Sequence, residues 1–390
     1  MNAKPMSNKA GTSSPTDAPS AKPVNSVVGY APDYIKAIAP YQPGRPIDEV
    51  ARAYRLDPSR IIKLASNENP LGMPDSARRA AVDAMVEVGR YPDGNGFDLK
   101  QALAARHRVP LEWLTLGNGS NDILELVARA LCRPGESIVF SEYAFAVYPL
   151  ATMAVGARPI VVPAREFGHD LDAMADAVTD DTRVMFVANP NNPTGTFAPG
   201  EAVRRLLERV PERVAVVLDE ADTEYLEPAQ RYDSIGWVRT FPNLIVSRTF
   251  SKAFGLAGLR VGFGVAQAAL TDLLNRVRQP FNVNVAAQAA ALAALADVAF
   301  LERSRQINRA GIGQLQQGFA ALGLRYVPSC ANFVLVEVGD AVRVNEALLE
   351  AGIIVRPVAN YGLPTWLRIT AGLPKENAAL LEALARIVRV

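Results

Sequence analysis

The feature that most constrains the fold is an alternation of short β-branched runs with amphipathic segments, which begins near Asp75. The stripe at 123–131 has apolar residues at helical spacing, and the run at 137–140 then indicates a strand. Further strands are predicted at 159–162, 183–187, 214–218 and 244–246, and further helices at 145–154 and near 200–209. This pattern is typical of a mainly parallel sheet with helices on both faces. We predict a large α/β domain over residues 70–285.

The remaining chain has a different character. Long helical stretches at 285–318, strands at 333–338 and 367–370, and a closing helix predict a smaller α+β domain over residues 286–390. Residues 27–69 carry aromatic residues and prolines without a clean period, and we predict an N-terminal arm and a segment of the small domain. Residues 1–26 are mostly Ser, Pro, Ala, Lys and Thr, a composition that predicts a disordered tail.

Composition excludes several classes of function. The 41 Lys and Arg residues balance 40 Asp and Glu residues, which argues against a nucleic-acid partner. No apolar run reaches the length of a membrane span, so we expect no membrane association. Cys132 and Cys330 stand far apart, and His107 and His169 have no metal-ligand spacing. We therefore expect a cytoplasmic protein without a metal site.

A glycine-containing turn precedes the predicted helix at 123–131. In Gly117-Asn-Gly-Ser120, the glycines permit close backbone approach, and the helix N-terminus that follows offers unpaired N–H groups to an anion such as phosphate. An ordinary capped turn is the competing interpretation. The third glycine of a dinucleotide fingerprint is missing, as is the Lys-Ser/Thr of a Walker loop, which disfavours a nicotinamide enzyme.

Three further residues suit one cofactor. Asp219 ends a predicted buried strand, where α/β folds bind ligands, although strands also end in Asp for capping reasons. Lys252 follows Ser251 and has apolar neighbours that can lower its pKa, although an isolated lysine is usually a surface charge. Arg260 lies eight positions further on. Together with the glycine turn, these residues meet the needs of pyridoxal phosphate: a Schiff-base lysine, a pyridinium partner and phosphate anchors.

An ordered series of motifs carries a family resemblance. The series consists of Ser66-Asn-Glu-Asn-Pro70, Arg90-Tyr-Pro92, Gly117-Asn-Gly-Ser120, Asn191-Asn-Pro-Thr-Gly195, Asp219-Glu-Ala221, Ser251-Lys-Ala-Phe254 and Leu367-Arg-Ile-Thr370. Over about residues 28–390 the chain resembles the fold-type I, class II pyridoxal-phosphate aminotransferases, and among them most the histidinol-phosphate aminotransferases. The resemblance implies a seven-stranded, mainly parallel sheet sandwiched by helices, a smaller α+β domain, and a homodimer with shared active sites.

The same resemblance implies cofactor contacts. Lys252 would form the Schiff base and then move the substrate's Cα proton, and Asp219 would bond the pyridine N–H. Asn192 would donate to the ring hydroxyl O3′, and Phe145 would stack on the ring, with core packing as its alternative. The phosphate group would be held by Ser120, Asn121, Thr249, Ser251, Arg260 and, from the partner subunit, Tyr91.

On the substrate side, Arg368 and Arg356 match arginines that bind the substrate's anionic group, in reach of Asn192. Tyr41 matches an arm tyrosine of the other subunit near that group. The planar guanidinium fork suits carboxylate and phosphate alike. The implied reaction is reversible: histidinol phosphate and 2-oxoglutarate give imidazole acetol phosphate and L-glutamate, a step of histidine biosynthesis. The small-molecule partners are thus an amino donor and a 2-oxo acid.

One position departs from the family pattern. The family has a tyrosine three residues after the aspartate, donating to O3′, whereas this chain has Asp222. Tyr225 is out of register with that position. An anionic Asp222 facing the cofactor would disfavour the phenolate form of O3′. We therefore predict slower transamination near neutral pH than a tyrosine would give.

The motifs leave other activities open. An aromatic amino-acid aminotransferase or a threonine-phosphate decarboxylase would share them, because the arginines accept a carboxylate as well as a phosphate. Outside the enzymes, such a domain can act as a cofactor-sensing module of a transcription regulator. That interpretation needs a basic DNA-binding domain, for which the sequence offers only the tail 1–26.

Overall fold

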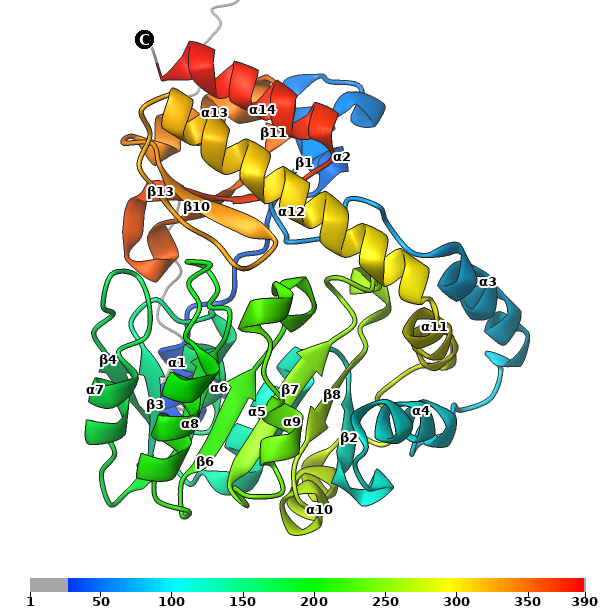
Figure 1. The fold of residues 1–390 in the computed structure, drawn as a ribbon. Coiled ribbons are helices and arrows are strands. Elements are labelled where there is room, and N and C mark those ends of the chain that lie inside the picture. Colours follow the sequence, from blue (N-terminus) through cyan, green and yellow to red (C-terminus); the bar gives the residue numbers. More distant parts are fainter. Residues whose placement is uncertain (1–26, 389–390) are drawn as a thin grey trace, which may run out of the picture.

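The computed structural model describes residues 27–388, and the tail predicted at 1–26 lies outside them. A seven-stranded sheet in the order β2-β8-β7-β6-β5-β3-β4 forms the centre of the larger half (Figure 1). Its strands are β2 (Leu114–Gly117), β3 (Ser137–Ser141), β4 (Arg158–Val162), β5 (Thr182–Ala188), β6 (Ala215–Asp219), β7 (Leu244–Thr249) and β8 (Gly262–Val265). All neighbours pair in parallel except β8, which is antiparallel to both β7 and β2. The predicted mainly parallel, seven-stranded sheet is confirmed.

Helices cover both faces of this sheet. The helices around it are α3 (Asp75–Ala84), α4 (Phe97–His107), α5 (Ser120–Leu131), α6 (Val147–Ala154), α7 (Leu171–Asp176), α8 (Gly200–Arg209), α9 (Ser234–Trp237), α10 (Ala268–Val277) and α11 (Val285–Ala296). Along β5, Met185 and Val187 join one core cluster, whereas Val184 and Phe186 join the cluster on the opposite face. Because both faces are buried, the strand is apolar throughout rather than alternating.

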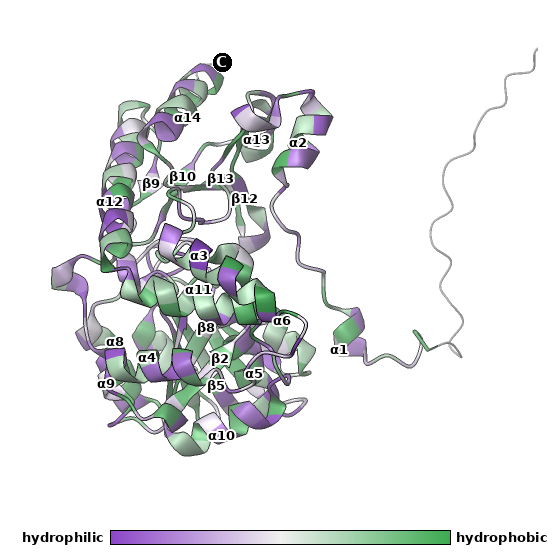
Figure 2. Cartoon of the chain, turned by 90° about the vertical axis from the view of Figure 1, so that its right-hand side faces the viewer, coloured by the Kyte–Doolittle hydropathy of each residue, from purple (hydrophilic) through white to green (hydrophobic). Residues whose placement is uncertain are grey.

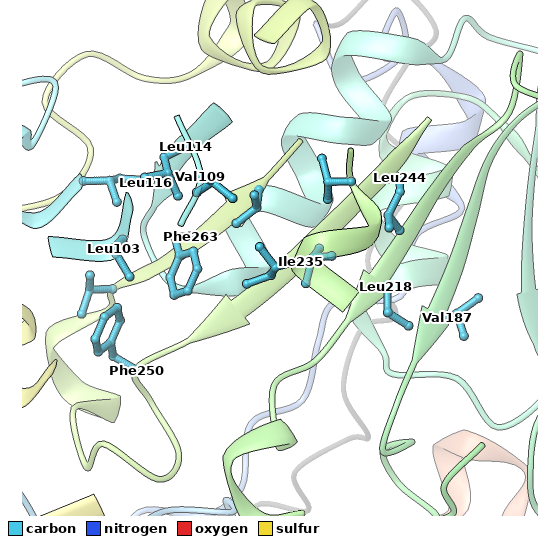
Figure 3. Close-up of a cluster of buried hydrophobic side chains, with 14 of the residues drawn as sticks. Leu103, Val109, Leu114, Leu116, Val187, Leu218, Ile235, Leu244, Phe250 and Phe263 are labelled. Carbon is cyan, nitrogen blue, oxygen red and sulfur yellow. The ribbon is translucent and has the colours of Figure 1, made fainter. Parts of the chain in front are cut away.

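The first cluster lies between the sheet and the helices α4, α7, α8, α9 and α11. Figure 3 shows part of it, with Leu218, Leu244 and Phe263 extending from neighbouring strands. The second cluster joins the other face to α5, α6 and α10 and contains Tyr148. The sheet is thereby fixed from both sides, and so are the side chains at its carboxyl edge.

The smaller half is built on a four-stranded sheet in the order β12-β13-β10-β9. Its elements are β9 (Tyr326–Val327), β10 (Phe333–Glu337), β12 (Arg356–Val358), β13 (Leu363–Thr370), the two-stranded pair β1 (Ile62–Lys63) and β11 (Ile353–Ile354), and the helices α13 (Ala341–Glu350) and α14 (Pro374–Ile387). The named pairs of the four-stranded sheet are antiparallel, so this half is α+β.

A long helix, α12 (Val298–Ala321), connects the two halves (Figure 1). Leu301 near its start belongs to the core of the large sheet, whereas Leu315 and Phe319 belong to the core of the small half. The alanines of α11 pack against α3 and join the large core. The exact domain limits of 27–69, 70–285 and 286–390 stay predictions.

The segment predicted as an irregular arm contains two helices, α1 (Asp33–Lys36) and α2 (Ile47–Tyr54). Val50 and Ala51 are the buried residues of α2, and Val50 packs against Leu349 and Ile354 of the small half. Figure 2 shows the part that carries α1 extending away from α3 and α11, which lie side by side. Among the described residues, no single helix is long and apolar enough to cross a membrane; only α11 and α12 together, bent by 80°, pass by length and composition.

Candidate active site

A pocket of about 190 Å³ lies at the carboxyl edge of the large sheet, below the small half. Lining residues come from the ends of β5, β6 and β7, from the start of α5, and from β12 and β13. The predicted site residues that line it are Tyr41, Ser120, Asn121, Phe145, Asn192, Asp219, Thr249, Ser251, Lys252, Arg260, Arg356 and Arg368. Of the thirteen predicted site residues, only Tyr91 lies elsewhere.

One end of the pocket is an anion cradle. Ser120 begins α5, and no described side chain caps this helix end. The first backbone N–H groups of the helix can therefore donate to an anion. Gly119 has φ +82° and ψ 172°, a backbone conformation that favours glycine, and a Cβ there would lie 2.5 Å from Nη2 of Arg260. Arg260 donates from Nη1 to Ser251 Oγ at 3.2 Å. Backbone N–H groups, a hydroxyl and a guanidinium thus converge on a space suited to a phosphate.

Asp219 supplies the acceptor in the middle of the pocket. Its side chain is buried, and Oδ2 accepts a hydrogen bond of 2.9 Å from Tyr148 Oη. Burial raises the pKa of Asp219 to about 7, and the neighbouring Asp222 and Glu220 charges act in the same direction. Oδ1 is buried and has no hydrogen-bond partner among the described residues. A protonated ring nitrogen would satisfy this oxygen and stabilise the ionised carboxylate.

Lys252 follows the turn after β7 and faces the same space. Its Nζ lies 3.4 Å from the carbonyl oxygen of Ser66. Burial lowers the pKa of this amine, whereas the Asp222 carboxylate raises it. A desolvated amine has a larger neutral fraction at neutral pH, which is the form that attacks carbonyl carbons and accepts protons.

Two arginines form the opposite end of the pocket. Arg356 on β12 and Arg368 on β13 are direct cross-strand partners, and both are buried. Arg356 donates to the carbonyl oxygen of Gln42 at 2.8 Å, and Arg368 to that of Ala65 at 2.9 Å. Burial lowers the pKa of Arg368, and the Arg356 charge contributes to the same shift. Within residues 27–388, the hydrogen-bond partners of the two guanidinium groups are carbonyl oxygens, and Asp222 acts on Arg368 by its charge alone, so the pair keeps a net positive charge.

Asn192 connects the two ends of the pocket. Its Oδ1 accepts a hydrogen bond of 2.7 Å from Arg368 Nη1, which leaves the amide NH₂ to serve as a donor. Phe145 also lines the pocket and meets the ring of Tyr148 edge-on at 6.0 Å. Tyr148 itself is a contact of Asp219 that the sequence did not reveal, because 71 residues separate the two partners.

Tyr41 and Tyr91, the two tyrosines predicted to reach the site of a second subunit, occupy different environments in this chain. The ring of Tyr41 covers Arg356 of its own chain, with the guanidinium carbon 5.6 Å from the ring centre. The arm therefore lies over the pocket of its own chain. Tyr91 stacks on Phe281 at 4.7 Å and is 82% exposed. Its hydroxyl is therefore available to a second molecule but not to the pocket of its own chain.

Asp222 is buried at the pocket wall, between the charges of Lys252 and Arg368. Burial raises its pKa, and those two cations oppose the shift. Its Oδ1 has no hydrogen-bond partner among the described residues. Tyr225 is buried but does not line the pocket, as its register predicts.

The chain belongs to the class I and II aminotransferase family, whose model matches residues 59–386. Within that class, two similar relatives carry the same name. It is 64% identical over 366 residues to histidinol-phosphate aminotransferase 1 of Cupriavidus pinatubonensis, covering 93% of this chain and 97% of the relative. It is also 64% identical over 359 residues to histidinol-phosphate aminotransferase 2 of Ralstonia nicotianae, covering 91% and 96%.

A solved structure agrees with membership of the aminotransferase family. The histidinol-phosphate aminotransferase of Sinorhizobium meliloti in complex with pyridoxal-5′-phosphate superposes with a TM-score of 0.85 at 27% identity, covering 94% of this chain and 99% of that one. The residues of the pocket fit such a cofactor, because the orphaned Asp219 Oδ1, the Lys252 amine and the anion cradle meet three of its chemical groups.

Proposed function

We propose that this chain catalyses pyridoxal-phosphate-dependent transamination between histidinol phosphate and 2-oxoglutarate, giving imidazole acetol phosphate and L-glutamate in histidine biosynthesis. The relatives of 64% identity carry the name of this activity. The observation in the structure that supports it most is the in-register pair Arg356 and Arg368 at the far end of the pocket from the anion cradle.

Like charges directly opposite each other on neighbouring strands are destabilising unless something compensates them. Here the partners of both guanidinium groups are carbonyl oxygens and aromatic rings, including Phe333, whose ring centre lies 5.3 Å from Arg368 Cζ. A dianion such as a phosphate monoester would neutralise both charges, and its oxygens can accept from two guanidinium groups at once. The distal carboxylate of 2-oxoglutarate would use the same pair in the second half-reaction.

Pyridoxal phosphate, when bound, supplies a carbonyl carbon for the amino group and a ring that accepts electrons. The cradle at Ser120, Ser251 and Arg260 would hold its phosphate. Asp219 Oδ1 would accept from the ring N–H and keep that nitrogen protonated, while the Asn192 amide would donate to the ring hydroxyl. Phe145 would pack against the ring.

Lys252 would carry the proton during turnover. Burial favours its neutral amine, and Nζ faces the same space as Asp219. From there the amine can take a proton from the substrate's Cα and return it to the cofactor's carbonyl carbon. Asp222 raises the proton affinity of the amine and so slows the return step near neutral pH.

We infer a homodimer with shared sites in the cytoplasm. The exposed Tyr91 and the arm residues Tyr30, Tyr34 and Ile35 support an interface. The Tyr91 hydroxyl has no hydrogen-bond partner within residues 27–388, so it is suited to reach the phosphate of a neighbouring subunit.

Single-turnover experiments test the proposed activity. Apoprotein loaded with pyridoxal phosphate is mixed with histidinol phosphate, histidine or phenylalanine, and conversion of the cofactor absorbance is followed. We expect histidinol phosphate to react much faster than the two amino acids. Faster reaction of phenylalanine would indicate an aromatic amino-acid aminotransferase. Release of CO₂ in a parallel sample that contains threonine phosphate would indicate the decarboxylase.

A further inference from the structure

Tyr148 is the only described residue whose side chain bonds the Asp219 carboxylate, and its surroundings hold it in one orientation. Its ring is 1% exposed and stacks on Phe186, with ring centres 4.7 Å apart and planes 12° apart. Phe145 meets it edge-on at 6.0 Å, and Phe140 contacts it at 6.4 Å. A tyrosine clamped by three rings loses little conformational entropy when its hydroxyl forms a bond.

The hydrogen bond divides the carboxylate into two different oxygens. Oδ2 accepts from the Tyr148 hydroxyl at 2.9 Å, which keeps that oxygen away from the pocket. Oδ1 has no partner among the described residues and belongs to a pocket-lining residue. Without the hydroxyl, rotation about the carboxyl group would let either oxygen face the pocket, and neither would be fixed.

The same hydroxyl opposes the charges that surround Asp219. Asp222 and Glu220 both disfavour its ionised form, as does burial, whereas the Tyr148 bond and the Lys252 charge favour it. Glu220 is itself paired with Arg248 at 2.7 Å. Within residues 27–388, Tyr148 is therefore the one hydrogen-bond donor that supports the ionised Asp219 carboxylate, which has several acidic neighbours.

We propose that Tyr148 is a positioning residue for the reaction: it orients Asp219 so that Oδ1 meets the cofactor's ring nitrogen, and it braces Phe145 beside the same ring. The inference rests on the proposed function. It assigns the α6 residue a role that acts through Asp219, without contact to the substrate.

Tyr148→Phe removes one hydroxyl and keeps the ring. Equilibrium binding to the apoprotein is measured for pyridoxal phosphate and for the analogue that has carbon in place of the ring nitrogen. Loss of a hydrogen bond to a charged group corresponds to roughly 10- to 100-fold in affinity. We expect this loss for pyridoxal phosphate only, together with a lower kcat at unchanged KM. Thr152→Val is the control, because it removes a buried hydroxyl that bonds the Tyr148 carbonyl on the same helix.

Equal weakening of both ligands, or no change for either, would overturn the proposal. A second measurement combines Tyr148→Phe with Asp219→Asn: if Tyr148 acts through Asp219, its replacement has little further effect in the Asp219→Asn background. Independent losses that multiply would contradict it. Should the unaltered protein bind pyridoxal phosphate without transaminating, the proposed function fails, and the binding comparison still decides the role of Tyr148.

Discussion

The two ends of the pocket are built in different ways. The end proposed to bind the cofactor lies where parallel strands of one sheet finish, so the positions of Asp219 and Lys252 follow directly from the order of β6 and β7. The end proposed to bind the substrate is assembled from the antiparallel pair β12 and β13 and from the arm that carries Tyr41. A change at the first end should affect all substrates equally, whereas a change at the second should affect them according to their charge.

The largest effect is expected from Lys252→Ala. Removing the proposed proton carrier should lower kcat by about 10⁴-fold. It should also abolish the absorbance band that the cofactor gives when it is bonded to the lysine amine. The single-turnover rates with histidinol phosphate and with glutamate should fall by the same factor. Lys100→Ala is a matched control, since burial also lowers the pKa of that lysine outside the pocket. Retained band and activity in Lys252→Ala would rule out the assignment.

Replacing the arginines should separate the two ends of the pocket. Arg368→Lys keeps the charge but loses the planar fork, and we expect kcat/KM for histidinol phosphate to fall by about 100-fold. Arg356→Lys should lower kcat/KM about tenfold through KM alone. Among the described residues, Arg356 donates to the arm carbonyl of Gln42, whereas Arg368 also donates to Asn192. Pyridoxal phosphate affinity, measured by titration of the apoprotein, should stay the same in Arg356→Lys. A loss of cofactor affinity in Arg356→Lys would contradict the division of the pocket into a cofactor end and a substrate end.

Asp222 lies between the two ends of the pocket, and its substitution tests whether they are coupled electrostatically. Its negative charge raises the pKa of the Lys252 amine, so removing it should lower the pH midpoint of the bound cofactor's absorbance. Asp222→Asn tests the charge alone, and Asp222→Tyr adds a hydroxyl donor. Both should speed transamination near neutral pH. Identical midpoints in all three proteins would show that the Asp222 charge does not reach the cofactor.

The smallest effect is expected from Tyr91→Phe, which keeps the stack on Phe281 but removes the hydroxyl. If Tyr91 reaches the phosphate of a second subunit, pyridoxal phosphate affinity should fall by about 3- to 10-fold. Sedimentation should show a dimer in both proteins. Tyr326→Phe is the control, because Tyr326 lies in β9 of the small half, outside the arm and the pocket. A monomeric native protein would end the shared-site model.

Sequence reasoning was most accurate where local chemistry decides the structure. The helix predicted near 200–209 matches α8, because Pro199 precedes a strongly amphipathic segment. The strand predicted at 214–218 differs from β6 by one residue at each end. The helix predicted at 145–154 begins two residues later, at Val147, which leaves Phe145 in the turn that lines the pocket.

Contacts between distant segments were beyond such reasoning. The bond between Tyr148 and Asp219 and the register of Arg356 with Arg368 depend on tertiary packing that no local pattern encodes. The short strands β1, β9 and β11, of two residues each, carry no period at all. Helix α2 was also missed, because only two of its residues are buried.

The contact between Gly119 and Arg260 limits how this site could be altered. A phosphate held by main-chain N–H groups cannot be released by exchanging one side chain, and position 119 accepts no substituent that would fill the cradle without displacing the arginine. Engineering the chain to accept a cofactor without a phosphate would therefore require moving the start of α5 itself. Variation among active descendants of this sequence should leave position 119 a glycine while the hydroxyl residues around it change.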